Sequence, residues 1–387
     1  MVNPFAPAQL GPITLRNRII KAATFEGRTP NRVVTDELID FHRAVAAGGA
    51  GMSTVAYCAV SREGTTDGRQ IVLTEDAVEG LRRLTDAIHA EGAAASAQIG
   101  HAGPVANPAG TRRRALAPSS FLTPFMQRTK AMTDVDFDRI QDDFVLGART
   151  AAESGFDALE IHLGHNYLLS SFLSPRLNKR DDGWGGTLEK RARFPREIVR
   201  AVRRAVGPKT ALLAKLNMDD GVRGGFGPEE SLRVATMLQD DDALDALELT
   251  GGSSLLNPMY LFRGPAPRRE FAATLPPVMR FGFRIVGRAL FRSYPWEEAY
   301  FRDIARAFKD ALEMPVILLG GISELSTISS ALDEGFAFVA MARALLSDPD
   351  LVNKMRDGRA SVSPCDHCNK CLPTIYSGTH CLLPSAR

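Results

Sequence analysis

The 387-residue sequence contains no apolar run that approaches the ~20 residues needed to span a membrane. It also lacks an excess of charge of one sign, because 47 lysines and arginines stand against 45 aspartates and glutamates. This balance gives no reason to expect nucleic acid as a partner. The N-terminal segment has neither a basic start nor an apolar core, so it does not predict a signal peptide, and we expect a cytoplasmic protein.

Cysteine is scarce in most of the chain and concentrated near its end. Cys58 stands alone, whereas Cys365, Cys368, Cys371 and Cys381 follow the spacing C-x2-C-x2-C-x9-C. In a reducing compartment, such clustering suggests a metal more than disulfides. The spacing alone leaves open a four-iron cluster, a structural zinc ion and free thiols.

A G-x-G-x-x-G turn after an early strand is also absent, which argues against a doubly wound dinucleotide-binding sheet. Short apolar segments instead alternate with helical stripes, one unit about every 40 residues, as in (β/α)8 barrels. We predict an α/β fold, a TIM barrel over residues 1–360 with a capping insertion at 252–294 and a cysteine-rich C-terminal extension at 361–387. The expected strands are residues 18–24, 51–57, 93–99, 158–161, 211–218, 243–251, 315–321 and 336–342.

Three helical segments carry further expectations. Residues 295–312 are expected to be helical, and one last helix is expected near 344–356. Pro195 is expected to mark a break near the start of its helix, because proline lacks a backbone N–H.

The stretch that follows the fourth strand offers three groups able to hydrogen-bond or carry a proton. His162, His165 and Tyr167 lie within six residues, just past the end of that strand. Side chains at a strand exit point toward the rim, so these residues are a candidate catalytic site. The alternative is a polar loop whose histidines cap the next helix.

In a TIM barrel, functional groups lie at the C-terminal ends of the strands. Gly320 and Gly321 end the seventh strand in register with Arg343 after the eighth, a place where barrels commonly bind phosphate. A tight turn is the alternative reading of the two glycines. The predicted rim also collects Ala22, Ala23, Thr24, Tyr57, Gln98, His162, His165, Tyr167, Lys215 and Ala342.

Several motifs along the chain resemble those of the old yellow enzyme family of FMN-dependent oxidoreductases. They are LRNRIIKAAT, AQIGHAG, IHLGHNYLLSSFLSPRLNKRDDGWGGTLEKRARF, VILLGGI and AMARALLSDPDL. The C-terminal CDHCNKC resembles the cysteine segment of the 2,4-dienoyl-CoA reductase branch, which holds a four-iron cluster. The second gap of that branch is one residue longer and its final gap is longer too, so the match is imperfect.

The resemblance implies FMN as cofactor, NAD(P)H as electron donor and, in the tail, a 4Fe–4S cluster. Gln98 would hydrogen-bond the pyrimidine edge of the flavin, and Lys215 would lie near N1 and O2, where reduction builds negative charge. Tyr57 would contact the ring mainly through its backbone. The remaining implied contacts are Ala22, Ala23 and Thr24 along the ring, Gly320, Gly321, Ala342 and Arg343 at the phosphate, and Cys365, Cys368, Cys371 and Cys381 at the cluster.

The resemblance further implies an ene reductase. NAD(P)H would reduce the flavin, which would then pass hydride to an alkene conjugated to a carbonyl or similar group. His162 and His165 would bind the substrate oxygen, and Tyr167 would supply the proton. The alternative within the fold is a dehydrogenase, demethylase-like or dienoyl-CoA-reductase-like enzyme that relays electrons through the cysteine cluster.

A reading from another class is a zinc hydrolase or a binding module on the same barrel. It would use His162 and His165 as zinc ligands, but the stretch lacks a carboxylate placed as a third ligand. It also leaves Gln98, Lys215 and Arg343 without a role.

The sequence departs from its relatives at several positions near the flavin. Lys215 stands where many have arginine, and Phe25 stands where relatives often place a cysteine or threonine. Gly27 replaces an aromatic residue, and Ala342 stands where glycine is usual. These changes would affect the redox potential of the flavin and the substrate preference more than they affect the binding of FMN.

The insertion includes an apolar, basic segment at residues 276–296. One interpretation is an ordinary capping subdomain or subunit contact. The other is a hydrophobic lid for a bulky substrate, because exposed apolar loops mark binding surfaces. The sequence leaves open whether the chain forms a homo-oligomer.

Overall fold

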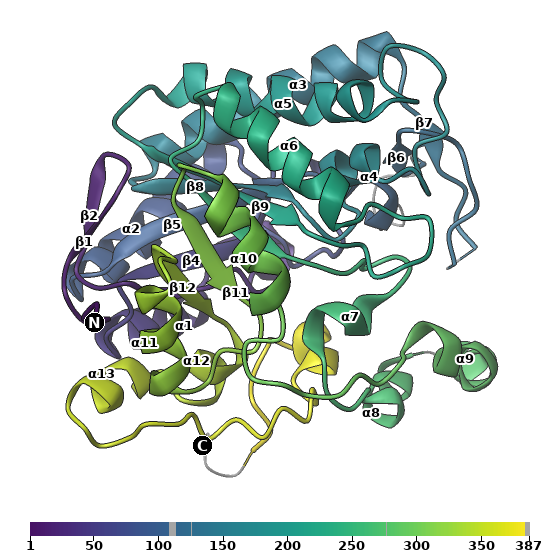
Figure 1. Ribbon diagram of the computed structural model, residues 1–387. Coiled ribbons are helices and arrows are strands. Elements are labelled where there is room, and N and C mark those ends of the chain that lie inside the picture. The colour runs from purple at the N-terminus through teal and green to yellow at the C-terminus, as the bar shows by residue number, and fades with distance from the viewer. Residues whose placement is uncertain (108–113, 125, 276, 384–387) are drawn as a thin grey trace.

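The computed structural model describes residues 1–107, 114–124, 126–275 and 277–383. Eight parallel strands close into a barrel in the order β10, β11, β12, β3, β4, β5, β8, β9 (Figure 1). The predicted TIM barrel is confirmed, and every predicted strand segment overlaps one of these strands. The strands are β3 Ile19–Lys21, β4 Met52–Ala59, β5 Ala94–Gly100, β8 Ala158–Leu163, β9 Ala211–Asn217, β10 Ala246–Thr250, β11 Val316–Leu319 and β12 Phe338–Met341.

Apolar residues close the N-terminal end of the barrel. A hairpin of β1 (Ala8–Leu10) and β2 (Ile13–Leu15) brings Leu10 and Leu15 into one buried cluster with Phe338. A larger cluster fills the space between the strands and the surrounding helices. Burial of this apolar area stabilises both layers, and toward the C-terminal ends the strands also carry buried polar residues, among them Gln98, His162 and Lys215.

Helices follow the strands as the alternation predicts. Thr35 caps α1, accepting a hydrogen bond from the backbone N–H of Leu38 at 3.3 Å. None of the described helices is long and apolar enough to cross a membrane. The main helices are α1 Asp36–Ala47, α2 Val78–Ala90, α3 Asp134–Glu153, α4 Leu168–Leu173, α5 Leu188–Val206, α6 Pro228–Asp240, α10 Arg302–Ala311 and α11 Leu325–Asp333.

Three helix predictions need correction. Pro195 lies inside α5 and does not break it, because the buried Phe194 and Ile198 hold this face against the barrel and offset the lost hydrogen bond. The last helix is two short ones, α12 (Arg343–Ser347) and α13 (Leu351–Arg356), because the proline at 349 keeps the residue before it extended. The helix expected at 295–312 is confined to α10.

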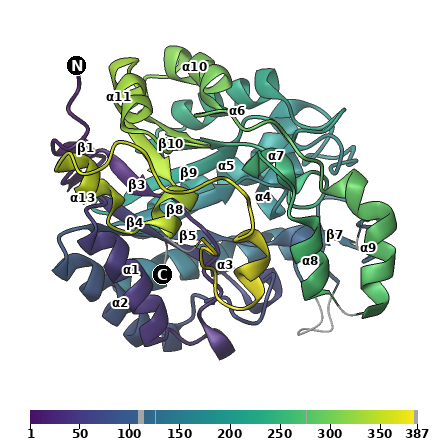
Figure 2. The same ribbon diagram turned by 90° about the horizontal axis from the view of Figure 1, so that it is seen from below.

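The insertion after β10 forms three helices to one side of the barrel, α7 (Pro258–Phe262), α8 (Arg268–Thr274) and α9 (Pro277–Leu290) (Figure 1). The C-terminal segment crosses the barrel and includes a 3-10 turn at Leu372–Tyr376 that packs near α8 (Figure 2). Its Thr379 donates a backbone hydrogen bond to the carbonyl of Glu26 at 2.8 Å. The insertion and the C-terminal segment therefore both border the rim of the barrel. The lid role of 276–296 stays a prediction, and residue 276 lies outside the described residues.

Candidate active site

The predicted trio of His162, His165 and Tyr167 lies together at the end of β8. Nδ1 of His165 is 3.3 Å from Nε2 of His162, and the His162 and Tyr167 ring centroids are 4.7 Å apart. His165 has a φ of 60°, and its backbone N–H donates to the side chain of Asn217 at 3.1 Å. The left-handed turn lets both imidazoles face the same space.

The alternative in which the histidines cap the next helix is not observed. Tyr167 is the N-cap residue of α4, and this cap has no side-chain hydrogen bond. Nε2 of His165 is instead 3.0 Å from the hydroxyl of Thr250, which ends β10. The two histidines therefore belong to the rim of the barrel.

Burial sets the protonation of the trio. It lowers the pKa of His165 to about 3 and that of His162 well below its ordinary value, and the Lys215 cation adds to both shifts. Burial raises the pKa of Tyr167 to about 12. At neutral pH the site therefore presents two uncharged imidazoles and a tyrosine that keeps its proton.

Lys215 lies in a buried polar network carried by four neighbouring strands. Its Nζ is 2.9 Å from Oε1 of Glu160 and 2.8 Å from Oε1 of Glu248. Nε2 of Gln98 donates to the same Glu160 oxygen at 2.6 Å. Gln98, Glu160 and Lys215 sit on β5, β8 and β9, and Glu248 pairs in register with Lys215 across β10.

Glu248 was missed by sequence reasoning, and Glu160 was noticed without a role. The signal that could have found Glu248 is a charged residue inside the apolar segment ALELT, where both faces of a parallel strand are buried. A charge at such a position requires a partner.

The segment after β3 reaches the same rim. Ala23 packs in a small apolar cluster with Tyr57 and with the catalytic candidate Tyr167. Ala22 is buried, and its backbone N–H donates to the carbonyl of Met341 at 2.9 Å. The hydroxyl of Thr24 donates to Oε1 of Glu26 at 3.3 Å. Ala23, Tyr57 and Tyr167 thus lie together at the rim, whereas Thr24 faces a carboxylate.

The predicted phosphate residues end β11 and β12. Gly320 and Gly321 have φ values of 114° and 77°, which favour glycine. A Cβ at Gly320 would lie 2.5 Å from the ring of Phe301, and one at Gly321 would lie 2.6 Å from the ring of Tyr300. Close aromatic packing therefore adds a second reason for glycine, which sequence reasoning did not foresee.

The donors expected for a phosphate are present here. Within the described part of the chain, the backbone N–H groups of Gly320, Gly321, Ala342 and Arg343 donate no hydrogen bond to another residue. The Arg343 guanidinium donates to the side chain of Asn369 and lies 5.0 Å from the Trp296 ring centroid. Unpaired donors beside an arginine fit the phosphate of FMN.

The four C-terminal cysteines are free and half-buried in this structure. Burial raises the pKa of the Cys371 thiol to about 12, and the nearby Arg343 cation opposes this shift. Among the described residues, no three His, Cys, Asp or Glu side chains are placed to hold a metal ion. The same observation gives the zinc reading of His162 and His165 no support.

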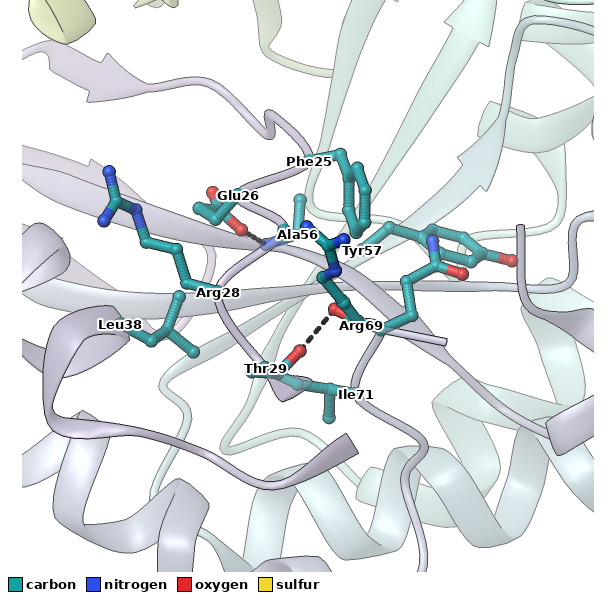
Figure 3. A pocket seen from close by; sticks show the side chains of 11 residues that line it. Phe25, Glu26, Arg28, Thr29, Leu38, Ala56, Tyr57, Arg69 and Ile71 are labelled. Carbon is teal, nitrogen blue, oxygen red and sulfur yellow. Dashed lines mark hydrogen bonds between the residues drawn. The ribbon is translucent and has the colours of Figure 1, made fainter. Parts of the chain in front are cut away.

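A small cavity with room for about one water molecule lies beside Tyr57, between the segment after β3 and the loop after β4 (Figure 3). Glu26, Arg28 and Arg69 contribute charged groups to its lining. The Glu26 carboxylate pairs with Lys21 Nζ at 2.6 Å, and Arg28 pairs with Glu37 outside the pocket. The Arg69 guanidinium forms no ion pair among the described residues and donates to the carbonyl of Tyr376, whereas the Arg69 backbone N–H donates to Oδ1 of Asp67 at 2.8 Å. The pocket therefore carries unbalanced positive charge.

Known proteins resemble the chain over its whole length. The family model described as NADH:flavin oxidoreductase / NADH oxidase matches residues 3–249. A 4,4'-dithiodibutanoate disulfide reductase from Rhodococcus erythropolis is 55% identical over 383 residues, which cover 99% of this chain and 95% of that protein. A metal reductase from Desulforamulus reducens is 35% identical over 376 residues, or 96% of this chain, but the chain spans about half (52%) of that protein.

A solved structure supports the fold. The old yellow enzyme homologue from Zymomonas mobilis matches with a TM-score of 0.74 and 21% identity, covering 100% of this chain and 98% of that one. At this identity the likeness concerns the barrel alone.

Proposed function

The chain belongs to the NADH:flavin oxidoreductase / NADH oxidase family, and from that premise we propose that it reduces small organic disulfides that carry carboxylates. It is an FMN-dependent NAD(P)H oxidoreductase, as the resemblance to old yellow enzymes implied. The observation that carries the substrate class is the 55% identity, over nearly both full lengths, to a reductase of a dicarboxylate disulfide.

The residues of the rim fit FMN. Gly320, Gly321, Ala342 and Arg343 would hold the phosphate through unpaired backbone N–H groups and a guanidinium. Gln98 and Lys215 would hold the pyrimidine end, and Ala22, Ala23, Thr24 and Tyr57 would line the ring. When bound, FMN supplies two-electron transfer between NAD(P)H and an acceptor.

The trio at the end of β8 would act on the acceptor. Reduction of a disulfide by NAD(P)H breaks the S–S bond and needs two electrons and two protons to give two thiols. Tyr167 keeps its proton at neutral pH and would protonate one leaving sulfur. The N–H groups of the neutral His162 and His165 would stabilise negative charge on the other sulfur until solvent protonates it.

The cavity beside Tyr57 would bind the carboxylate end of the substrate once movement of the partly exposed Arg69 side chain widens it, because at present it has room for about one water molecule. The ring of Tyr57 separates the cavity from the proposed proton donor Tyr167, and the two ring centroids are 5.3 Å apart. Four bonds of about 1.5 Å join a sulfur to the carboxyl carbon of a butanoate arm, so the arm is long enough to reach across the Tyr57 ring. The Arg69 guanidinium, which forms no ion pair among the described residues, would supply the cation.

Reoxidation of the reduced enzyme tests this function. FMN-loaded protein is reduced with one equivalent of NADH under nitrogen and mixed with 4,4'-dithiodibutanoate or with cyclohexenone. We expect the flavin absorbance to return with the disulfide, and two thiols per flavin to be labelled by a bimane reagent. Reoxidation by the disulfide no faster than in buffer would contradict the proposal.

Alkene reduction is the second candidate. The same two neutral imidazoles suit the oxygen of an enone, and Tyr167 suits protonation of its α-carbon. Faster reoxidation by cyclohexenone than by the disulfide would select it.

Electron relay through the cysteine tail remains a prediction that one measurement settles. Among the described residues, no three possible ligands are placed to hold a metal ion, so the arrangement of the cysteines favours neither iron nor zinc. About four irons per chain in protein purified without oxygen would support the relay.

A further inference from the structure

Lys215 is one cation shared by two buried carboxylates. Glu160 and Glu248 both approach its Nζ within 3 Å, at 2.9 and 2.8 Å. The side chains of Lys215, Glu160 and Glu248 are 3%, 2% and 1% exposed, so solvent screens none of them. These three groups together carry one more negative than positive charge if all of them ionise.

The two carboxyl groups are not equivalent. Glu160 also accepts a hydrogen bond from Gln98 Nε2, which favours its charged form. Glu248 contacts the Lys215 ammonium ion and the Glu160 carboxyl group, and the Glu160 charge disfavours the ionised form of Glu248. The excess proton therefore belongs on Glu248.

Other charged groups around Glu248 do not change this assignment. On one side, β9 and β8 bring Lys215 and Glu160, and on the other side, β11 brings Val316–Leu319, which cannot titrate. A second buried pair, Lys21 and Glu26, lies farther along the barrel, and its two charges compensate each other at 2.6 Å. Burial first and Glu160 second raise the pKa of Glu248 to about 8.

We propose that Glu248 is a positioning residue that controls the net charge presented by Lys215 and takes up a proton when the cofactor is reduced. This inference rests on the proposed function, in which Lys215 lies where reduction places negative charge. With Glu248 neutral, the Lys215 cation is opposed by Glu160 alone. With Glu248 ionised, Lys215, Glu160 and Glu248 together carry a net negative charge, which repels the negative charge that reduction adds.

The electrons and protons balance in both ranges of pH. When Glu248 is already protonated, reduction of the holoenzyme takes up two electrons and one proton. When Glu248 is ionised in the oxidised enzyme, the added negative charge favours its protonation, and a second proton enters from solvent onto Oε1 or Oε2 of Glu248. NAD(P)H supplies the electrons, and no further reactant is needed.

The midpoint potential of the bound FMN, measured from pH 6 to pH 10, tests the proposal. A two-electron couple that takes up one proton changes by 29.6 mV for each tenfold change in proton concentration. We expect the wild-type holoenzyme to follow this slope at low pH and to double it above about pH 8, the pKa of Glu248. A single slope across the whole range would overturn the proposal, whatever the variants do.

Two matched variants identify the group responsible. Glu248→Gln keeps the shape and an acceptor for Lys215, so we expect the steeper segment to vanish. Glu160→Gln removes the neighbouring negative charge, so we expect the break to move to lower pH. A steeper segment that persists unchanged in Glu248→Gln would assign the proton to another group and overturn the proposal.

Failure of the proposed function gives a different result. If the protein binds no FMN, no potential can be recorded and the family-based cofactor assignment fails. If FMN binds and the wild-type slope stays constant, only the role of Glu248 fails. A purely structural Glu248 would alter the unfolding midpoint without moving the break in slope.

Discussion

The two halves of the barrel rim are built in different ways. On the half formed by β5, β8, β9 and β10, strand register places Gln98, Glu160, Lys215 and Glu248, and all four are buried. On the half formed by β11 and β12, Arg343 is held by Asn369 and Trp296, which come from distant segments. Strand register thus fixes the half that carries the buried charges, whereas long-range packing shapes the half that we propose binds the phosphate.

This difference predicts that substitutions on the two halves will affect stability and cofactor binding unequally. A group held by register in a dry interior has no alternative partner, so its loss exposes uncompensated charge. A group held by loops can readjust, so its loss should weaken binding of the cofactor more than it weakens the fold. Four substitutions test this contrast, from the largest expected effect to the smallest.

Lys215→Met should have the largest effect, because it leaves Glu160 and Glu248 buried without a cation. We expect a loss of about 3–5 kcal/mol in the free energy of unfolding and loss of bound FMN. Urea unfolding followed by circular dichroism measures the first effect. The double variant Lys215→Met/Glu248→Gln should recover part of the stability, and equal instability of both variants would contradict the charge argument.

Tyr167→Phe should slow catalysis without loosening the fold. The ring keeps its edge contacts with Tyr57 and His162, but the proton donor is lost. We expect flavin reduction by NAD(P)H to be retained and acceptor reduction to slow by about 10²–10⁴-fold. Stopped-flow absorbance separates the two half-reactions, and unchanged acceptor turnover would remove Tyr167 from the mechanism.

Gly321→Ala probes the packed half of the rim. The new Cβ meets the Tyr300 ring and also adopts a positive φ of 77°. We expect FMN to dissociate about tenfold more readily, which corresponds to ~1.4 kcal/mol. Gly224→Ala is the matched control, because Gly224 has a φ of 71° but its added Cβ meets nothing within 4 Å. Equal FMN affinity in the two variants would show that the aromatic contact is irrelevant.

Arg69→Gln should have the smallest effect, because this side chain is partly exposed. We expect kcat/KM for 4,4'-dithiodibutanoate to fall about fivefold, or ~1 kcal/mol, with little change for the neutral diamide. Arg28→Gln is the control in the same pocket, since Arg28 is already paired with Glu37. An equal loss for the charged and neutral disulfides would reject carboxylate recognition.

The same contrast explains what the sequence could predict. Periodicity gave the barrel, and the short spacing of His162, His165 and Tyr167 gave the proton-carrying trio, because both depend on neighbours within one strand and its exit. Glu248 was missed because its partner lies on another strand, and Phe301 and Tyr300 were missed because their contact with the glycines depends on how the start of α10 packs against the end of β11. Local patterns place a residue on the rim but do not identify its partners.

Binding of FMN to the stripped protein tests the central claim most directly. We expect quenching of flavin fluorescence to saturate at one FMN per chain, with a micromolar or tighter dissociation constant, and the bound flavin to bleach on addition of NADH or NADPH. A folded protein that leaves the fluorescence of micromolar FMN unchanged would contradict the account.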